Sequence, residues 1–226
     1  MKAAYISLVN AHHDLFVKTG ILHRDISPNN LMVDHSNHRQ GVLIDLDIAA
    51  RVNEEGNPID GLPLPVAGTL PYRAWELIRP ERPPRAYYRH DLESFFYSLL
   101  WIVFHYQDGV YYHNPMAHVT SFDFDENWSG TRGNKEGFLI AAHKRSLPPA
   151  PLVHEWLNKL RTLFGCAYDA ERLELYAVKA PSISPPSSPT SSVSSRVSSI
   201  ANFSSTLGGR VSFKAFMEIL ITTDSN

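Results

Sequence analysis

Residues 23–47 read HRDISPNNLMVDHSNHRQGVLIDLD, and this stretch gives the strongest indication of the fold of the 226-residue chain. Two short apolar runs, LMVD and GVLIDLDIA, flank the polar stretch His35 to Gln40. They predict two short strands joined by a turn. Asp25 and Asn30 precede the first strand, and Asp45 closes the second. We therefore expect three oxygen-bearing side chains at the mouth of one small hairpin.

These three side chains are typical of a site for phosphoryl transfer. The carboxylate of Asp45 and the amide oxygen of Asn30 are hard ligands that suit Mg²⁺ or Mn²⁺. The carboxylate of Asp25, outside the inner shell of the metal, can accept or orient the proton of a hydroxyl group. Phosphoryl transfer needs these parts because its catalysis consists mainly of positioning reactants and neutralising charge.

The sequence around this stretch predicts mainly α-helical structure. Residues 2–18 place Tyr5, Leu8, Val9, His12 and Phe16 on one face, and Gly20 follows as a stop signal. Two further helices are predicted downstream, over 136–145 and 152–164.

A long loop and a buried helix are predicted between these elements. Residues 51–73 are rich in Gly, Pro and charge, and long loops in compact domains are usually functional or disordered. Asp91 is predicted to cap a helix that is apolar around most of its surface and therefore buried. Its inward residues are predicted to be Leu92, Phe95, Phe96, Leu99, Leu100 and Val103.

The C-terminal quarter of the chain has a different composition. Residues 181–200 contain ten Ser and four Pro, too little apolar surface to offset the entropy cost of ordering the chain. We therefore predict a disordered linker over 179–209 and a short helix within 210–226. The apolar residues of this helix are Phe213, Phe216, Met217 and Leu220. Two interpretations stay open: a marginal helix at a frayed end, or a helix that docks on the domain or on a partner.

Composition and charge exclude several classes of protein. The single cysteine, Cys166, rules out an internal disulfide. A net charge of −2 gives no electrostatic reason to expect a nucleic-acid or membrane partner. The longest apolar run, 95–104, is too short to span a bilayer. The first residues lack the unbroken apolar stretch of a signal peptide, so an intracellular, cytoplasmic or nuclear location is expected. The sequence does not indicate the oligomeric state.

Four motifs in order give the chain a resemblance to protein kinases. HRD at 23–25 with Asn30 resembles the catalytic loop HRD-x-x-x-x-N, and DLD at 45–47 occupies the place of Asp-Phe-Gly. GTLPYRAWE at 68–76 is similar to the segment that ends the activation loop, GT-x-x-Y-x-A-P-E. HDLESFFYSLLWI at 90–102 resembles the buried central helix of the kinase C-terminal lobe. These variants are most similar to the fungal-type protein kinase family.

The resemblance implies a mainly α fold, with a protein kinase-like C-terminal lobe over residues 1–178 and a short β-hairpin at the catalytic cleft. A disordered tail follows. It also implies ATP and Mg²⁺, or Mn²⁺, as cofactors, and a protein substrate that offers a Ser or Thr hydroxyl. The expected reaction moves the γ-phosphate of ATP to that hydroxyl.

The resemblance also implies the roles of individual residues. Asp25 would be the catalytic base, and Asn30 and Asp45 would bind the Mg²⁺ ions that bridge the ATP phosphates. Arg24 would tie the catalytic loop to the activation loop. Thr69 would lie near the substrate hydroxyl.

Three residues would be structural, and one departs from the family pattern. Glu76 would be an ion-pair partner below the activation loop, and Asp91 would anchor the HRD backbone that begins at His23. Ser27 stands at a cofactor-binding position, two residues after Asp25, where Ser/Thr kinases usually carry a Lys that touches the γ-phosphate. A hydroxyl cannot supply that charge.

An arginine in HRD commonly pairs with a phosphorylated activation loop. Between Asp45 and Glu76, however, the only hydroxyl-bearing residues are Thr69 and Tyr72, close to the expected substrate. We therefore hypothesise that an acidic residue of the loop partners Arg24 instead. The candidates are Glu54, Glu55 and Asp60.

The motifs cover only the lower lobe of a two-lobed enzyme. Only 22 residues precede His23, and they contain neither G-x-G-x-x-G nor a strand with a V-A-I-K-like lysine. We therefore expect a truncated or partial domain with impaired activity alone. The alternatives are a pseudokinase fragment that acts as a binding scaffold, and a small-molecule phosphotransferase with the same catalytic loop. The segment Gly68 to Glu76 disfavours the latter, because it builds a platform for a peptide.

Overall fold

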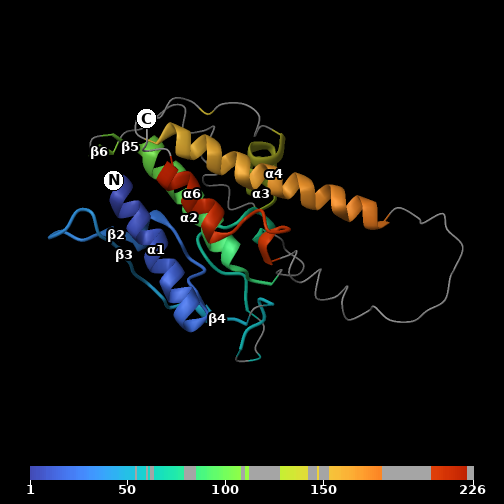
Figure 1. Cartoon of the computed structure of the whole chain (residues 1–226), viewed down its shortest axis with the longest axis horizontal. Helices are drawn as coiled ribbons and strands as arrows, with labels where there is room; N and C mark the ends of the chain where they lie inside the picture. The colour runs from blue at the N-terminus through green and yellow to red at the C-terminus, as the bar shows by residue number, and fades with distance from the viewer. Residues whose placement is uncertain are drawn as a thin grey trace, which may run out of the picture.

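The computed structural model of the chain describes residues 1–53, 55–59, 61, 64–78, 85–107, 110–111, 128–141, 147, 153–179 and 205–222. This part of the chain is mainly helical, with small two-stranded antiparallel sheets, and so confirms the predicted mainly α class. Figure 1 shows α1, α2 and α6 running side by side, with α4 along one end of them, β2 and β3 on the far side of α1, and β5 and β6 at the end of α2.

The first helix, α1 (Lys2–Thr19), confirms the prediction for 2–18. Its face towards the core buries Tyr5, Leu8 and Val9, three of the residues that the helical period selected. The helix ends at Gly20, whose φ of 71° is left-handed and whose N–H donates to the Phe16 carbonyl at 2.7 Å. Glycine adopts this conformation without the steric cost of a Cβ atom, which explains the stop.

The predicted strand pair is present and lies against α1. β2 (Leu31–Val33) and β3 (Gly41–Leu43) pair antiparallel, with Leu31 opposite Leu43. α1 approaches β3 so closely that a Cβ at Gly41 would lie 2.2 Å from the Cγ of Leu8. Two smaller sheets complete the set: β1 (Ile21–Leu22) with β4 (Ala50–Arg51), and β5 (Tyr106–Gln107) with β6 (Val110–Tyr111).

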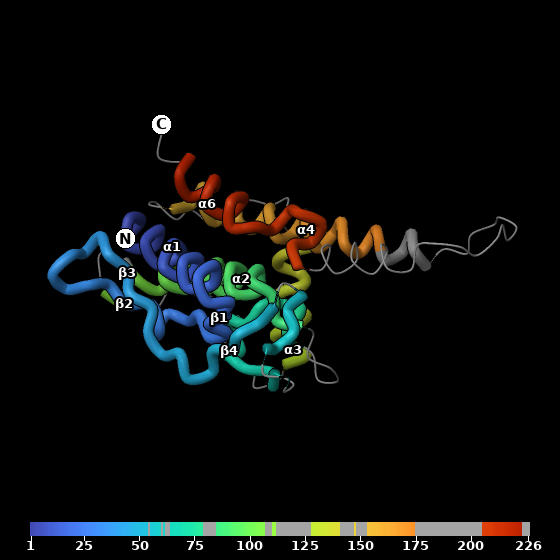
Figure 2. The backbone as a smooth tube through the Cα atoms, turned by 60° about the horizontal axis from the view of Figure 1, so that its bottom comes forward, coloured from blue at the N-terminus to red at the C-terminus, as the bar shows by residue number. Residues whose placement is uncertain are grey.

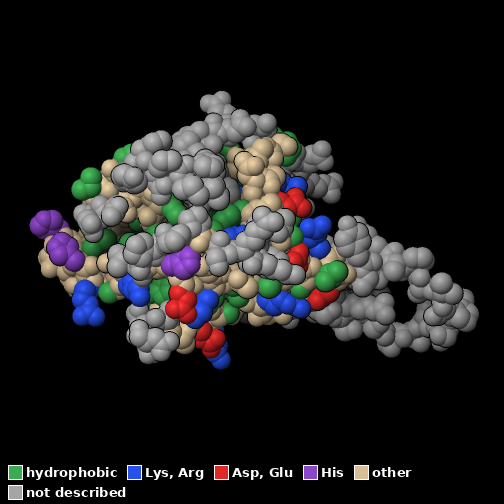
Figure 3. All heavy atoms as spheres, turned by 90° about the horizontal axis from the view of Figure 1, so that it is seen from above, with side chains coloured by type: hydrophobic (Ala, Val, Ile, Leu, Met, Phe, Trp, Pro, Cys, Tyr) green, Lys and Arg blue, Asp and Glu red, His purple; other side chains and the backbone are tan. Residues whose placement is uncertain are grey.

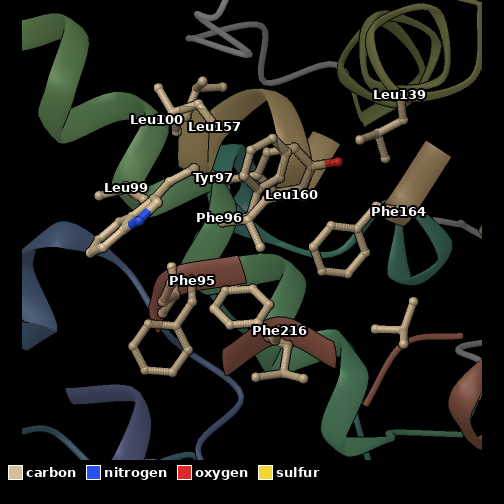
Figure 4. Close-up of a cluster of buried hydrophobic side chains, with 14 of the residues drawn as sticks. Phe95, Phe96, Tyr97, Leu99, Leu100, Leu139, Leu157, Leu160, Phe164 and Phe216 are labelled. Carbon is tan, nitrogen blue, oxygen red and sulfur yellow. The ribbon is translucent and has the colours of Figure 1, made fainter. Parts of the chain in front are cut away.

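The core is built around α2 (Tyr88–His105). Five of its six predicted inward residues are buried, and Val103 is half-buried. Figure 4 shows aromatic and leucine side chains of α2 meeting those of α4 (His154–Lys179) and α6 (Phe213–Thr222). One prediction is wrong: α2 begins at Tyr88, so Asp91 lies in its first turn and is not the N-cap. The carboxylate turns instead towards the backbone of His23 and Arg24.

Two further helices differ from their predicted bounds. α3 (Trp128–Glu136) begins eight residues earlier than the predicted 136–145 and continues as a π-helical segment, η5 (Gly137–Ala141). The two glycines and the many polar residues of α3 hid its helical period. Residues 142–145 lie outside the described residues. α4 begins at His154, near the predicted start, and extends to Lys179.

The C-terminal helix docks on the same core. In Figure 2, α6 lies beside α4 and above α1. Phe216 and Leu220 of α6 are fully buried, and the ring of Phe213 stacks on His13 of α1 with centroids 3.6 Å apart. Both ends of the predicted linker 179–209 carry described structure: Lys179 is the last residue of α4, and residues 205–209 form a turn that buries Leu207. The rest of that linker, 180–204, lies outside the described residues.

Replacing Phe216 by Ala is expected to lower the free energy of unfolding by about 3–5 kcal/mol, because it leaves a cavity between α6 and α4. The measurement is urea unfolding of the full chain followed by circular dichroism. Ile221→Ala on the same helix is the matched control, since Ile221 is 58% exposed, and it should change stability little. Equal stability of the two variants would contradict the docked position of α6.

None of the described helices combines the length and apolar character needed to cross a bilayer. On the face seen in Figure 3, acidic and basic side chains of the described residues lie interspersed over the elements.

Candidate active site

Asp25 forms the centre of the site, on the loop between β1 and the short 3₁₀ helix η1 (Pro28–Asn30). Its Oδ1 accepts hydrogen bonds from the backbone N–H and the hydroxyl of Thr69, both at 2.8 Å. Its backbone carbonyl and its Oδ2 accept from the Nδ2 of Asn30, at 2.9 and 3.3 Å. Asp25 therefore contacts both Asn30, which is five positions away in the sequence, and Thr69, which is 44 positions away.

The hairpin brings Asn30 and Asp45 to the same end. The N–H of Ile44 donates to the carbonyl of Asn30 at 3.2 Å, so Asp45 follows directly across from η1. Asp45 is exposed, and among the described residues its carboxylate accepts one long bond, from the Asp47 N–H at 3.5 Å. Because the Nδ2 of Asn30 points at Asp25, the Oδ1 of the same amide group faces away from Asp25.

The amide oxygen of Asn30 and the carboxylate of Asp45 are the kinds of oxygen ligand that Mg²⁺ prefers. In the part of the chain that the structure describes, no group of three or more His, Cys, Asp or Glu side chains could bind a metal ion by itself. An ion at Asn30 and Asp45 would therefore need further oxygens. Mg²⁺ is usually held in this manner, by one or two protein ligands together with phosphate oxygens and water.

Two site residues have left-handed backbone conformations that non-glycine residues rarely adopt. Arg24 has a φ of 69° and Asp45 has a φ of 64°. Each such conformation costs about 1–3 kcal/mol and persists only where the surrounding structure imposes it. At Arg24 the constraint is visible, because its N–H donates to the Oδ1 of Asp91 at 3.1 Å.

Asp91 holds the catalytic loop on the core. Its Oδ2 accepts from the His23 N–H at 2.8 Å and from the Nε2 of His12 at 2.8 Å, while its Oδ1 accepts from Arg24. Burial alone would raise the pKa of this carboxyl, but the hydrogen bond from His12 and the other donors outweigh it and hold the pKa below the usual range. Sequence reasoning placed His12 on the inner face of α1 and missed this contact.

The catalytic loop is tied down at further points. The imidazole of His23 is fully buried, and its Nε2 donates to the Ile44 carbonyl at 3.0 Å, which joins the loop to the end of β3. Its Nδ1 is then the acceptor for the Asp25 N–H at 3.4 Å. The hydroxyl of Ser98 on α2 donates to the Ile26 carbonyl at 3.2 Å. The backbone on both sides of Asp25 is therefore fixed.

Arg24 connects the catalytic loop to the segment that follows the hairpin. Its guanidinium donates to the carbonyls of Ile48 and Pro65. The structure thus gives it backbone carbonyls where an acidic side chain was hypothesised, and no bond to Glu55 is present. The other two candidates, Glu54 and Asp60, lie outside the described residues.

The backbone of Arg24 also passes very close to Gly68. A Cβ at Gly68 would lie 2.4 Å from the Arg24 carbonyl oxygen, and Gly68 has a φ of 89°. Glycine at this position therefore lets the segment with Thr69 approach Asp25.

Replacing Gly68 by Ala is expected to push this segment away from the catalytic loop, because the new methyl group collides with a backbone oxygen that cannot rotate aside. We expect a loss of stability of about 1–3 kcal/mol from overpacking and backbone strain. Thermal unfolding of the full chain measures it. Gly61→Ala shares the positive φ, but its new methyl group would meet no described atom within 4 Å, so a loss as large as that of Gly68→Ala would rule out the steric cause.

Glu76, the last residue of the 68–76 segment, forms an ion pair with Arg89, and its Oε2 lies 3.1 Å from the Nε2 of His90. Burial alone would raise the pKa of Glu76, but the hydrogen bond from His90 and the charge of Arg89 outweigh it and hold the pKa well below its usual range. Burial lowers the pKa of His90, and the charge of Arg89 adds to this effect.

Glu93 on α2 is a buried carboxylate that sequence reasoning missed. Its Oε1 accepts from the Trp75 N–H at 2.9 Å and from the Tyr97 hydroxyl at 2.8 Å, and its Oε2 accepts from the Tyr168 hydroxyl at 2.6 Å. It therefore joins the 68–76 segment to α2 and α4. The available signal was a carboxylate inside an otherwise apolar helix, because a buried charge requires partners.

Ser27 is only 3% exposed, as the N-cap of η1, with no side-chain capping bond. The structure therefore places this residue beneath the surface of the loop and gives it little access to a bound phosphate.

Comparison with known proteins agrees with the motifs. Residues 3–103 match the family model described as fungal protein kinase. This range includes the catalytic loop, the hairpin, the 68–76 segment and most of α2. A search among curated proteins finds no match. The resemblance to fungal protein kinases that the sequence predicted is thus confirmed over residues 3–103, which are kinase-like.

Proposed function

We propose that this kinase-like chain transfers the γ-phosphate of ATP to a Ser or Thr hydroxyl of a protein substrate. The observation that carries the proposal is the set of contacts around Asp25. Its carboxylate bonds the backbone and hydroxyl of Thr69 on one side and Asn30 on the other, next to the exposed carboxylate of Asp45.

The roles follow from this arrangement. Asp25 orients the acceptor hydroxyl and takes its proton while the oxygen forms a bond to the γ-phosphorus. The bond between that phosphorus and the oxygen bridging the β- and γ-phosphates breaks, and ADP leaves with the electron pair. Asn30 and Asp45 hold Mg²⁺, which supplies charge neutralisation at the phosphate oxygens.

The segment from Gly68 to Glu76 favours a peptide acceptor over a small molecule. It lies directly against Asp25 through Thr69, and Glu93 fixes its far end through the Trp75 N–H. A platform that starts at the catalytic carboxylate and is fixed from below can position an extended peptide beside the reacting hydroxyl.

The proposal is tested with the full chain in two assays. The first measures the shift of the melting temperature with Mg²⁺-ATP, for the natural chain and for Asp45→Asn. The second measures incorporation of labelled phosphate into a Ser/Thr peptide library. We expect a Mg²⁺-dependent shift that Asp45→Asn abolishes, and labelling of peptides, because Asp45 contributes one of the two protein ligands to the metal.

The rival functions give different results in the same assays. A binding scaffold predicts no shift with Mg²⁺-ATP in the natural chain, and that result would overturn the proposal. Labelling of a small amine or sugar, with none of peptides, would instead support a small-molecule phosphotransferase.

A further inference from the structure

We propose that Arg73 supplies the positive charge that binds the transferred phosphoryl group beside Asp25. This inference rests on the proposed function, and it names a residue that none of the four motifs assigned to the phosphate.

The charge balance around Asp25 requires such a residue. Transfer of a phosphoryl group develops negative charge on its oxygens, and a fixed cation beside them stabilises it. Ser27, close to Asp25 in the loop, is neutral and buried. The guanidinium of Arg24 is engaged with two backbone carbonyls of the neighbouring segment.

The geometry connects the guanidinium of Arg73 to the segment that bonds this carboxylate. It donates to the carbonyl of Gly68, the residue before Thr69, whose own N–H and hydroxyl bond the Oδ1 of Asp25. The backbone N–H of Arg73 closes the same turn by donating to the Thr69 carbonyl at 3.1 Å. The negative charge of Asp25 acts on this guanidinium and opposes the lowering of its pKa by burial.

Arg73 also retains hydrogen-bonding capacity. Its Nε is buried and finds no acceptor within the part of the chain that the structure describes. A guanidinium offers five N–H donors in a fixed plane and matches the oxygens of a phosphate in a two-pronged manner. One such bond to Gly68 leaves donors for a phosphoryl group.

Two side chains of α3 contact the segment that carries Arg73. The Nζ of Lys135 on α3 donates to the carbonyl of Arg73, and the guanidinium of Arg132 lies over the ring of Trp75, 4.8 Å from its centroid. Lys135 is fully buried and also packs on the ring of Tyr97. The backbone that carries Arg73 is therefore fixed before any ligand arrives, as an electrostatic role in catalysis requires.

Binding of Mg²⁺ with inorganic tripolyphosphate to the full chain, measured by calorimetry, tests the inference without requiring activity. We expect Arg73→Met to weaken binding about tenfold, since it removes charge-assisted hydrogen bonds to a phosphate. The affinity of Arg73→Lys should lie between those of the natural chain and Arg73→Met. Lysine keeps the positive charge but loses the planar pair of N–H donors that a guanidinium offers to a phosphate. Where phosphotransfer is measurable, kcat of Arg73→Met should fall about 100-fold.

Arg51→Met is the matched control. Arg51 also donates from its guanidinium to a backbone carbonyl, that of Thr19, but it lies on β4 outside the site. We expect it to bind tripolyphosphate as the natural chain does. A loss in Arg51→Met as large as that in Arg73→Met would overturn the inference.

Two measurements separate a charge role from a purely structural one. Added methylguanidinium should restore tripolyphosphate binding to Arg73→Ala if the missing group is a local cation. An absence of rescue, with Arg73→Lys as weak as Arg73→Met and equally lowered melting temperatures, would show that Arg73 only supports the turn at Gly68.

The remaining outcomes separate this inference from the proposed function. If Arg73→Met binds tripolyphosphate normally while Asp45→Asn does not, Arg73 is not the phosphate ligand and the proposed function stands. If the natural chain does not bind Mg²⁺ with tripolyphosphate at all, both fail. If Arg73→Met alone weakens binding but no phosphate is transferred, the inference stands and the proposed reaction fails.

Discussion

Replacing Asp25 by Asn is expected to lower the rate of phosphotransfer about 10³-fold, while binding of Mg²⁺-ATP is retained. The reason is that an amide cannot accept the hydroxyl proton, and general base catalysis contributes about 10²–10⁴-fold. The amide oxygen can still accept the two bonds from Thr69. The new NH2 group loses the 3.3 Å bond from the Nδ2 of Asn30, but this Nδ2 keeps its 2.9 Å bond to the backbone carbonyl of residue 25. The measurement is kcat with peptide substrate, together with the melting temperature with and without Mg²⁺-ATP.

The matched control for this variant is Asp14→Asn. Asp14 is an exposed carboxylate of α1 that pairs with Lys18 of the same helix, and its loss should leave kcat unchanged. Phosphotransfer by Asp25→Asn at the natural rate would remove Asp25 from the role of base. Loss of Mg²⁺-ATP binding together with activity would show that Asp25 acts in binding.

Replacing Asp91 by Asn is expected to lower the free energy of unfolding at neutral pH by about 3 kcal/mol and to reduce phosphotransfer. Oδ2 of Asp91 accepts from two donors and Oδ1 from a third. An amide group in either position must face at least one buried N–H, and leaving a buried polar group unsatisfied costs about 1–3 kcal/mol. The freed loop would also release the strained backbone of Arg24. Urea unfolding at neutral pH measures the loss.

The pH dependence gives this prediction a second test. The pKa of Asp91 is lower in the folded state than its ordinary value of about 3.9, so the folded state binds fewer protons there. Its stabilisation is present above pH 4 and is lost as the pH falls through the folded-state pKa. The difference in stability between the natural chain and Asp91→Asn should therefore shrink on acidification. A constant difference down to the acid transition would contradict a role for the charge.

The sequence by itself determined the local parts of this molecule. The period of residues 2–18, the two apolar runs of the hairpin and the apolar helix after residue 90 were each predicted and observed. The placement of Asp25 and Asn30 in one loop, five residues apart, was also read from the sequence, and the structure adds the hydrogen bond between them. These features depend on neighbours in the chain, so composition and period are sufficient to predict them.

The tertiary structure alone decided the contacts that fix the site. His12 meets Asp91 across 79 residues, and Tyr168 meets Glu93 across 75. Such pairs depend on how helices pack, and a single buried polar side chain does not identify its partner.

The same reason applies to Arg73 and to α6. Arg73 bonds the Gly68 carbonyl, next to the residue that contacts Asp25, because the positive φ of Gly68 lets its turn approach the loop. Similarly, α6 returns to α1 after a Ser/Pro-rich stretch. Burial and desolvation, which decide what a polar group must pair with, are properties of the packed chain and not of the local sequence.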